Sequence, residues 1–318
     1  EVTIRPQGAI SFLNESDRLA KIKMDSDIRF QAGNMMQFRN LAKPIKAFGR
    51  NKGSVVEIEK YQKLAKATGT ISELQSLPMQ KPNVGFVQAT IAEYGNGVSY
   101  TKKSQTLAEY SVDETLKKIL AMNVAESMDQ VAGTEFQNAD VFYTPTSTSA
   151  GTLDKDGTVS TSAGASITAA HIRDLIRNLK TDNVPKWDGN SYLAILSAFA
   201  MAKLFEDTAT GGIVDLHKYD QPENLINGEI GSYFGMRFVE ENNVLSNTIG
   251  GSAHNGEGII CGFEPVVEAL VEPESTMAES WDFNRFTGIA WNALTGFKKV
   301  WTNSTDSEYH LVRIHSND

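Results

Sequence analysis

The sequence is poor in the residues that build cross-linked or metal-bound folds. Its 318 residues include one cysteine, Cys261, so no disulfide can form within the chain and no zinc site can be built from cysteines. The five histidines are scattered, and none has a spacing typical of a metal site. Nine prolines and a charged share of 22% are ordinary for a folded protein. The composition predicts a self-supporting core with no metal and no cofactor.

Long apolar runs are also missing. The longest extends from Tyr192 to Phe205 and is interrupted by Lys203. A helix that crosses a bilayer needs roughly 20 apolar residues, so we expect no membrane contact of this kind. With only one cysteine, the chain is expected to fold in the cytoplasm.

Motifs that carry catalysis are absent from the sequence. There is no phosphate-binding glycine loop, no Gly-x-Ser-x-Gly turn and no zinc-protease motif. Acidic neighbours such as Glu240 and Glu241 point in different directions and do not form an acid–base pair. The sequence predicts that the protein is not an enzyme, and an acidic hydrolase is the least favoured function.

Charge is distributed unevenly along the chain. Residues 1–105 carry 16 basic and 9 acidic groups, a net +7, whereas the remainder carries 14 and 30, a net -16. The basic groups between residues 18 and 52 alternate with apolar residues and lack stacking aromatics, which favours a solvated arm over a nucleic-acid reader. A third interpretation is an arm that docks on the acidic body of an identical neighbour. The candidate interface residues of this arm are Arg18, Lys21, Arg29, Arg39 and Lys43.

The next segment, residues 53–106, has an extended pattern. Ser54–Leu64 and Val84–Thr101 are rich in β-formers, and the stretch between them contains Gly69, Pro78 and Pro82. The pattern predicts one long hairpin with two polar faces, which projects from the body because neither face can be buried. Its lysines, Lys60 and Lys63 among them, are expected to be solvated. Apolar residues near the tip are predicted to contact a neighbouring subunit, namely Ile71, Leu74, Leu77 and Met79.

A long helix is predicted at residues 112–138. Ser111-Val-Asp-Glu114 has the pattern of a capping box at the start of the helix. Gly133, near the end, is expected to lower the stability of the helix without interrupting it. Apolar residues recur at spacings of four and three and predict a buried stripe made of Leu116, Leu120, Val124, Met128 and Val131.

The rest of the chain predicts a compact mixed domain followed by strands. A helical stripe follows Thr168, a buried strand is predicted at Tyr192–Ser197, and a helix at Ala198–Glu206. Further β-prone segments are expected around residues 281–300 and 309–314.

This order of elements resembles the major capsid protein of tailed bacteriophages, which has the Hong Kong 97 fold. The segments Ile91-Ala-Glu-Tyr-Gly-Asn-Gly-Val-Ser-Tyr100 and Gly228-Glu-Ile-Gly-Ser-Tyr-Phe-Gly-Met-Arg-Phe-Val-Glu240 are similar to motifs of its N-four-like branch. The resemblance implies an α+β chain with an N-terminal arm (1–52), an E-loop hairpin (53–106), a P-domain with its spine helix (107–165), an A-domain (166–265) and a return to P-domain strands (266–318).

The resemblance also implies a structural function. Hexamers and pentamers of the chain would close an icosahedral head around double-stranded DNA, which the acidic body would contact weakly and without sequence specificity. Scaffold, portal and decoration proteins are the implied partners, and the virion, assembled in the host cytoplasm, is the implied location. An encapsulin, a bacterial compartment shell of the same fold, is the alternative, which a cargo-docking cleft would distinguish.

Overall fold

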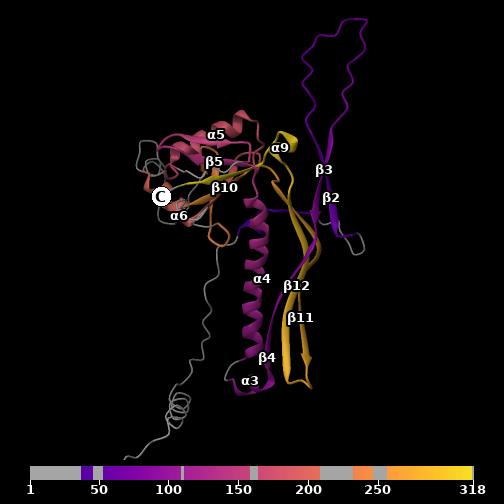
Figure 1. Ribbon diagram of the computed structural model, residues 1–318, viewed down its shortest axis with the longest axis vertical. Coiled ribbons are helices and arrows are strands. Elements are labelled where there is room, and N and C mark those ends of the chain that lie inside the picture. Colours follow the sequence, from indigo (N-terminus) through magenta and orange to yellow (C-terminus); the bar gives the residue numbers. More distant parts are fainter. Residues whose placement is uncertain are drawn as a thin grey trace, which may run out of the picture.

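One long helix and two large sheets organise the chain, and a two-stranded hairpin projects from them (Figure 1). The computed structural model describes residues 37–45, 53–108, 111–157, 164–207, 232–245 and 256–316. The sheets are a four-stranded ribbon sheet in the order β1-β11-β12-β4 and a seven-stranded sheet in the order β6-β5-β13-β10-β7-β9-β8. Strands β2 and β3 form the hairpin.

The long helix is α4, Val112–Gln137, within a residue of the predicted bounds. Leu120 and Met128 of the predicted stripe are buried, while Leu116, Val124 and Val131 are half-buried against the same hydrophobic cluster. Ser111 occupies the N-cap position, but its side chain makes no capping hydrogen bond, so the predicted capping box is not formed. Asp113 and Glu114 still place negative charge at the positive end of the helix dipole.

The ribbon sheet lies along α4 (Figure 1). It contains β1 (Lys43–Ile45), β4 (Ala92–Thr101), β11 (Val266–Trp281) and β12 (Phe286–Lys299). Alternate residues of β12, Ile289 and Trp291 among them, are buried against the helix. The Trp291 indole N–H donates to the Asn123 side-chain oxygen of α4 at 3.2 Å, which fixes the helix on the sheet.

The hairpin predicted at residues 53–106 ends earlier in the chain than expected. Strand β2 (Val55–Tyr61) pairs with β3 (Val84–Thr90), but β4 pairs with β12 and belongs to the ribbon sheet. The reason is the alternation of Tyr94, Val98 and Tyr100, which gives β4 one apolar face that packs in the α4 cluster. The hairpin therefore ends at Thr90 and not at residue 106.

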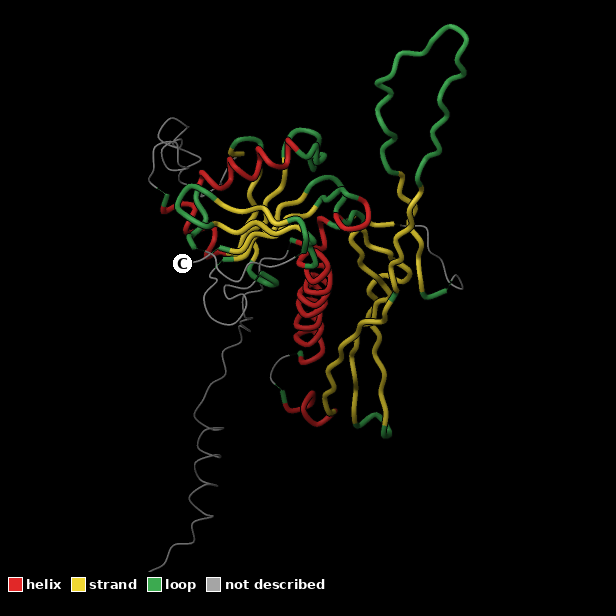
Figure 2. The backbone as a smooth tube through the Cα atoms, turned by 45° about the horizontal axis from the view of Figure 1, so that its top comes forward, coloured by secondary structure: helices red, strands yellow, loops and turns green. Residues whose placement is uncertain are grey.

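The seven-stranded sheet forms a separate layered domain beside one end of α4 (Figure 2). Its strands are β5 (Val141–Pro145), β6 (Gly151–Asp154), β7 (Tyr192–Ser197), β8 (Ser232–Tyr233), β9 (Met236–Glu241), β10 (Glu257–Cys261) and β13 (Leu311–His315). Strands β5, β6 and β13 lie outside the predicted range of 166–265. They join the sheet by pairing with β10 and with one another, which the local pattern does not encode.

Both faces of this sheet are covered. Helices α5 (Ala169–Thr181) and α6 (Ala198–Glu206) pack with Tyr192, Ala194 and Leu196 of β7 in one cluster. Leu193 and Ile195, the alternate residues of β7, belong to the cluster that contains α4. Because both faces are covered, β7 is apolar throughout rather than alternating.

The remaining described helices are short: α2 (Phe38–Leu41), α3 (Lys102–Leu107) and α9 (Asn303–Asp306). None of the helices in the described ranges is long and apolar enough to cross a membrane.

Residues 38–45 belong to the body, contrary to the prediction of a solvated arm over residues 1–52. Phe38 is fully buried and its ring centroid lies 5.2 Å from that of Phe136 in α4. Strand β1 pairs in parallel with β11. A Cβ added to Gly133 would lie 2.9 Å from the Phe38 ring and 2.6 Å from Val244, so glycine at this helical position makes room for both side chains.

Replacing Phe38 by alanine should lower the free energy of unfolding by about 3–5 kcal/mol, because the core loses a fully buried ring and gains a cavity. Denaturant unfolding of the unassembled chain measures the loss. Phe263→Ala is the matched control, since that ring is 46% exposed. An equal effect of the two variants would contradict the placement of residues 38–45 in the core.

Candidate assembly surfaces

The hairpin continues beyond its paired strands as a long open loop, residues 62–83 (Figure 1). Few hydrogen bonds are formed inside it, among them Gln75 N–H to the Ser72 carbonyl at 3.0 Å and the Gln80 amide to the Ala65 carbonyl at 3.2 Å. The predicted tip residues face solvent: exposed fractions are 48% for Ile71, 101% for Leu74, 71% for Leu77 and 95% for Met79. Their own chain offers these side chains no core.

The base of the hairpin, in contrast, is fixed to the body. Val56 and Ala89 are buried together with Ala269 of β11 in a small hydrophobic cluster. Lys60, two positions further along the same face of β2, is also buried, and its amine forms an ion pair with Asp306 of α9 at 2.5 Å. The prediction that Lys60 is solvated is wrong, because the alternation of β2 places it on the same side as Val56.

The Lys60–Asp306 pair is nearly complete in its hydrogen bonding. The Lys60 amine also donates to the Val300 carbonyl at 3.2 Å, and Asp306 accepts from the Thr302 backbone N–H at 2.9 Å. Burial alone would raise the pKa of Asp306, but the hydrogen bonds from Lys60 and Thr302 and the charge of Lys60 outweigh it and hold the pKa below its usual value. The hairpin is thereby held to α9 by a charged contact that water barely reaches.

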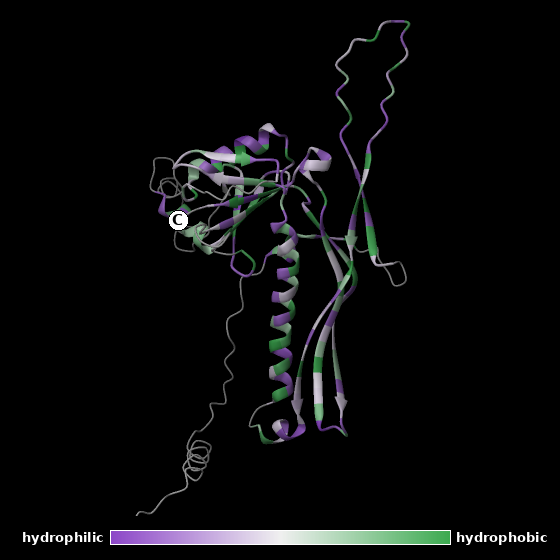
Figure 3. Ribbon diagram, in the orientation of Figure 1, coloured by the Kyte–Doolittle hydropathy of each residue, from purple (hydrophilic) through white to green (hydrophobic). Residues whose placement is uncertain are grey.

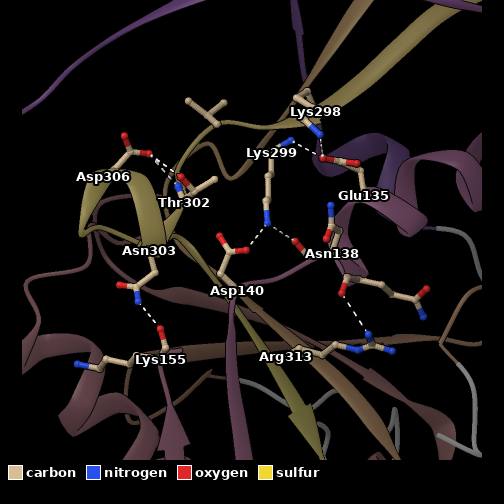
Figure 4. Close-up of polar contacts among 12 residues, drawn as sticks. Glu135, Asn138, Asp140, Lys155, Lys298, Lys299, Thr302, Asn303, Asp306 and Arg313 are labelled. Atoms are coloured by element: carbon tan, nitrogen blue, oxygen red, sulfur yellow. Dashed lines mark hydrogen bonds and ion pairs between the residues drawn. The ribbon is translucent and has the colours of Figure 1, made fainter. Parts of the chain in front are cut away.

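The last residues of β12 connect the ribbon sheet to the seven-stranded domain through further polar contacts (Figure 4). The Lys299 amine donates to the Asn138 carbonyl at 2.8 Å and to Asp140 at 2.5 Å, both just beyond the end of α4. Lys298 pairs with Glu135 at 3.2 Å. These contacts fix the end of β12 against the point where α4 enters the domain.

Helix α9 also contacts the seven-stranded domain directly. The Asn303 side-chain amide donates to the Lys155 carbonyl (Figure 4). The Lys155 amine pairs with Asp182 at 2.6 Å. The Tyr309 hydroxyl donates to Asp182 at 2.5 Å. A single short segment, residues 300–309, therefore touches the hairpin, the ribbon sheet and the domain.

The predicted arm residues divide into two groups. Arg18, Lys21 and Arg29 lie outside the described residues. Arg39 forms ion pairs with Glu268 at 3.4 Å and with Glu274, and Lys43 pairs with Glu264. Both cations therefore form ion pairs with carboxylates of their own chain. A contact of Arg39 or Lys43 with a neighbouring subunit would have to form beside these internal ion pairs or replace them.

Nowhere in the ranges that the structure describes do three His, Cys, Asp or Glu side chains gather closely enough to hold a metal ion. Cys261 is fully buried, and burial raises the pKa of its thiol. Many of the exposed large apolar side chains lie in the loop 62–83 and at the far end of the ribbon sheet, and others, such as Phe205, Phe234 and Phe263, lie on the seven-stranded domain. Figure 3 shows that the projecting loop mixes hydrophobic and hydrophilic residues.

Comparison with known proteins gives structural neighbours only. No protein-family model matches the sequence, and a search of curated proteins finds no similar sequence. The capsid of cyanophage Pam1 aligns at a TM-score of 0.70 and 16% identity over 94% of this chain and 97% of that one. The head structure of Helicobacter pylori bacteriophage KHP40 gives 0.70 at 13% identity, with 100% and 99% covered. A chain of Mycobacterium phage Che8 gives 0.66 at 15%, with 92% and 96% covered.

These alignments cover nearly the whole chain and confirm the predicted α+β fold. The architecture defines a fold class in which a spine helix packs on a ribbon sheet, with a projecting loop and a layered domain. The chain has the Hong Kong 97 fold of tailed-phage capsid proteins.

Replacing Lys60 by methionine should destabilise the chain by about 3–5 kcal/mol, because the Asp306 carboxylate would stay buried without its cation. The matched control is Lys63→Met, for which a loss of about 0–1 kcal/mol is expected, because the Lys63 side chain is 71% exposed and its amine pairs with Glu308 at 3.3 Å. Urea unfolding near pH 7 compares the two. Equal stabilities of the two variants would show that the buried pair does not hold the hairpin base.

Proposed function

We propose that this chain is the major capsid protein of a tailed bacteriophage, which assembles with copies of itself into the icosahedral shell of the virion. The observation that carries the proposal is the projecting loop, an extended segment with apolar side chains that its own chain does not cover. The fold shared with solved phage capsids supports the same conclusion. No feature of the described residues favours a catalytic role or a cargo-binding compartment.

The energetics of the loop favour contact with a second subunit. Ordering the 22 residues of loop 62–83 costs conformational entropy, and few internal hydrogen bonds offset that cost. Burying the exposed side chains of Leu74, Leu77 and Met79 on a neighbour would contribute roughly 1.5–3 kcal/mol each. Contact with a neighbour therefore supplies stabilisation that the loop lacks on its own chain.

Charge supports the same arrangement. The loop carries Lys63, Lys66 and Lys81 against a single Glu73, whereas residues 106–318 have a net charge of -16. Opposite potentials on the loop and on the body favour association of identical subunits. The same acidic body suits a container that encloses double-stranded DNA at high density without binding it tightly, since Lys and Arg contacts to phosphate generate most non-specific affinity.

An icosahedral shell of this kind also implies particular oligomers, partner proteins and a place of assembly. Hexamers and pentamers of the chain would form the head, with scaffold and portal proteins as partners in assembly and decoration proteins as partners on the finished shell. Assembly would take place in the host cytoplasm.

The proposal is tested by expressing the full chain alone and together with the scaffold and portal proteins of the phage that encodes it, and by imaging the products with negative-stain microscopy. Closed particles or capsomers of uniform size are expected. A chain that stays monomeric in both preparations at concentrations of tens of micromolar would overturn the proposal.

The loop contact is tested by the triple variant Ile71→Ala, Leu74→Ala and Leu77→Ala. The melting temperature of the unassembled chain should stay unchanged, because these side chains contact no core, while the concentration needed for assembly should rise at least tenfold. The control changes Ser72, Gln75 and Ser76 to alanine in the same loop, which removes no apolar surface. Light scattering follows assembly, and a destabilised monomer with normal assembly would show that the loop folds back on its own chain.

A further inference from the structure

A tight turn between β5 and β6, residues 146–150, is fixed to the start of α5. All five of its residues are exposed. Two backbone N–H groups donate to the Ala150 carbonyl at 2.9 and 3.0 Å, which closes the turn. The hydroxyl of Thr168, the N-cap residue of α5, donates to the Thr148 carbonyl at 3.1 Å. The turn therefore rests on the first residues of the helix.

A second side chain of α5, the fully buried His171, also holds the turn, and it uses both ring nitrogens. Its Nδ1 lies 3.0 Å from the Thr168 backbone nitrogen. Because a backbone N–H can only donate, Nδ1 carries no proton and accepts this hydrogen bond. The ring proton is therefore on Nε2, which donates to the Ser147 carbonyl at 2.8 Å and lies 3.3 Å from the Ala150 carbonyl oxygen. The neutral imidazole bridges the helix start and the turn.

The surroundings of His171 suit the neutral ring and not the charged one. A second proton, on Nδ1, would leave the Thr168 backbone N–H without its acceptor, even if the Thr168 hydroxyl oxygen, 2.9 Å away, accepted the new N–H. It would also place positive charge at the positive end of the α5 dipole. Burial lowers the pKa of His171, and the hydrogen bonds to the two turn carbonyls and the charges of Asp174 and Asp207 offset only part of that effect. Protonation therefore favours a conformation in which the ring reaches water.

Few charged groups surround the ring. Its hydrogen bonds within the described ranges go to Thr168 and to the turn carbonyls, and none goes to a carboxylate. Asp174 forms an ion pair with another residue of α5, and Asp207 accepts from a backbone N–H of that helix at 2.9 Å. The turn has no charged side chain, and Asp154 of β6 alternates with a core residue and so points away from the ring. The titratable and charged groups on the elements around the ring are Tyr143, Asp154, Asp174, Arg177 and Asp207.

We infer that His171 is an acid-sensitive latch, which holds the turn 146–150 on α5 while its ring is neutral and releases the turn when the ring is protonated. His310, which is also buried, differs in its surroundings. Its two ring nitrogens lie near acceptors, the Phe263 carbonyl at 2.5 Å and the Glu308 carboxylate at 3.4 Å, so a protonated ring keeps both partners. The latch lies within one chain and does not depend on the proposed self-assembly.

The direction of the pH effect follows from the lowered pKa of His171. The ring binds a proton more readily once the turn has opened and water reaches it. The closed turn is therefore fully stabilised above about pH 6.5, the ordinary pKa of histidine, and loses stability as the pH falls below that value. With a pKa of about 6.5 in the open state, the equilibrium constant for opening rises up to roughly thirtyfold by about pH 5.

Hydrogen–deuterium exchange of the unassembled full chain tests the latch, read by mass spectrometry on peptides from residues 143–157. His171→Gln is the informative variant, because glutamine at this position of a capping box accepts from the Thr168 N–H and offers the turn a donor, but does not titrate. Dividing the wild-type rate by that of the variant at each pH cancels the chemical effect of pH. The ratio should be near one at about pH 7.5 and rise roughly ten- to thirtyfold by about pH 5. A constant ratio overturns the inference.

Two further variants and the wild type alone complete the test. His171→Ala removes the hydrogen bonds at every pH, so the turn should exchange about tenfold faster than in the wild type already at about pH 7.5, and wild-type protection would overturn the inference. His310→Gln is the matched control, and loss of the pH response of the turn in this variant would also overturn it. If the variants do not fold, the wild-type rate is divided by that of a free peptide of the same sequence, and no rise of this ratio toward acid pH refutes the latch. None of these results bears on the proposed shell function.

Discussion

The packing of α4 against both sheets is the contact on which the rest of the structure depends. One hydrophobic cluster contains Leu120, Met128 and Phe136 of the helix together with residues of the ribbon sheet and of the seven-stranded sheet. The ribbon sheet is open on its other side over much of its length, so it relies on the helix for its buried face. The hairpin relies on the ribbon sheet in turn, because its hydrophobic cluster among the described residues includes Ala269 of β11. Extended parts of this size stay ordered because a single helix joins their cores.

Local patterns were sufficient to predict the elements with strong periodicity. The bounds of α4, β7 and α6 agree with the sequence to within a residue, because four-and-three spacing and short apolar runs report directly on a buried face. The exposed tip of the hairpin was also predictable, since apolar residues among prolines and polar residues have no strand or helix to join. The fold as a whole followed from the order of these elements.

What the sequence did not reveal are the contacts between segments far apart in the chain. Phe38 packs on a helix almost a hundred residues later, and Gly133 provides the space for it, so a residue that looked like a weak point in the helix is required by packing. The pairing of Lys60 with Asp306 spans 246 residues and is invisible to local composition. One signal was available: Val56, Ile58 and Lys60 share a strand face, which indicated that the lysine lies on the buried side.

The buried pair at the hairpin base has a mechanical consequence. The loop is a cantilever, with its free end at residues 71–79 and its support at β2 and β3. A pull on the tip acts with the whole length of the loop as a lever arm, so the torque is greatest at the support. There the seven residue pairs of the β2–β3 ladder and the Lys60–Asp306 contact share the load. Since Asp306 sits in the segment that also touches the seven-stranded domain, a force on the tip passes into the body of the subunit rather than bending the hairpin alone.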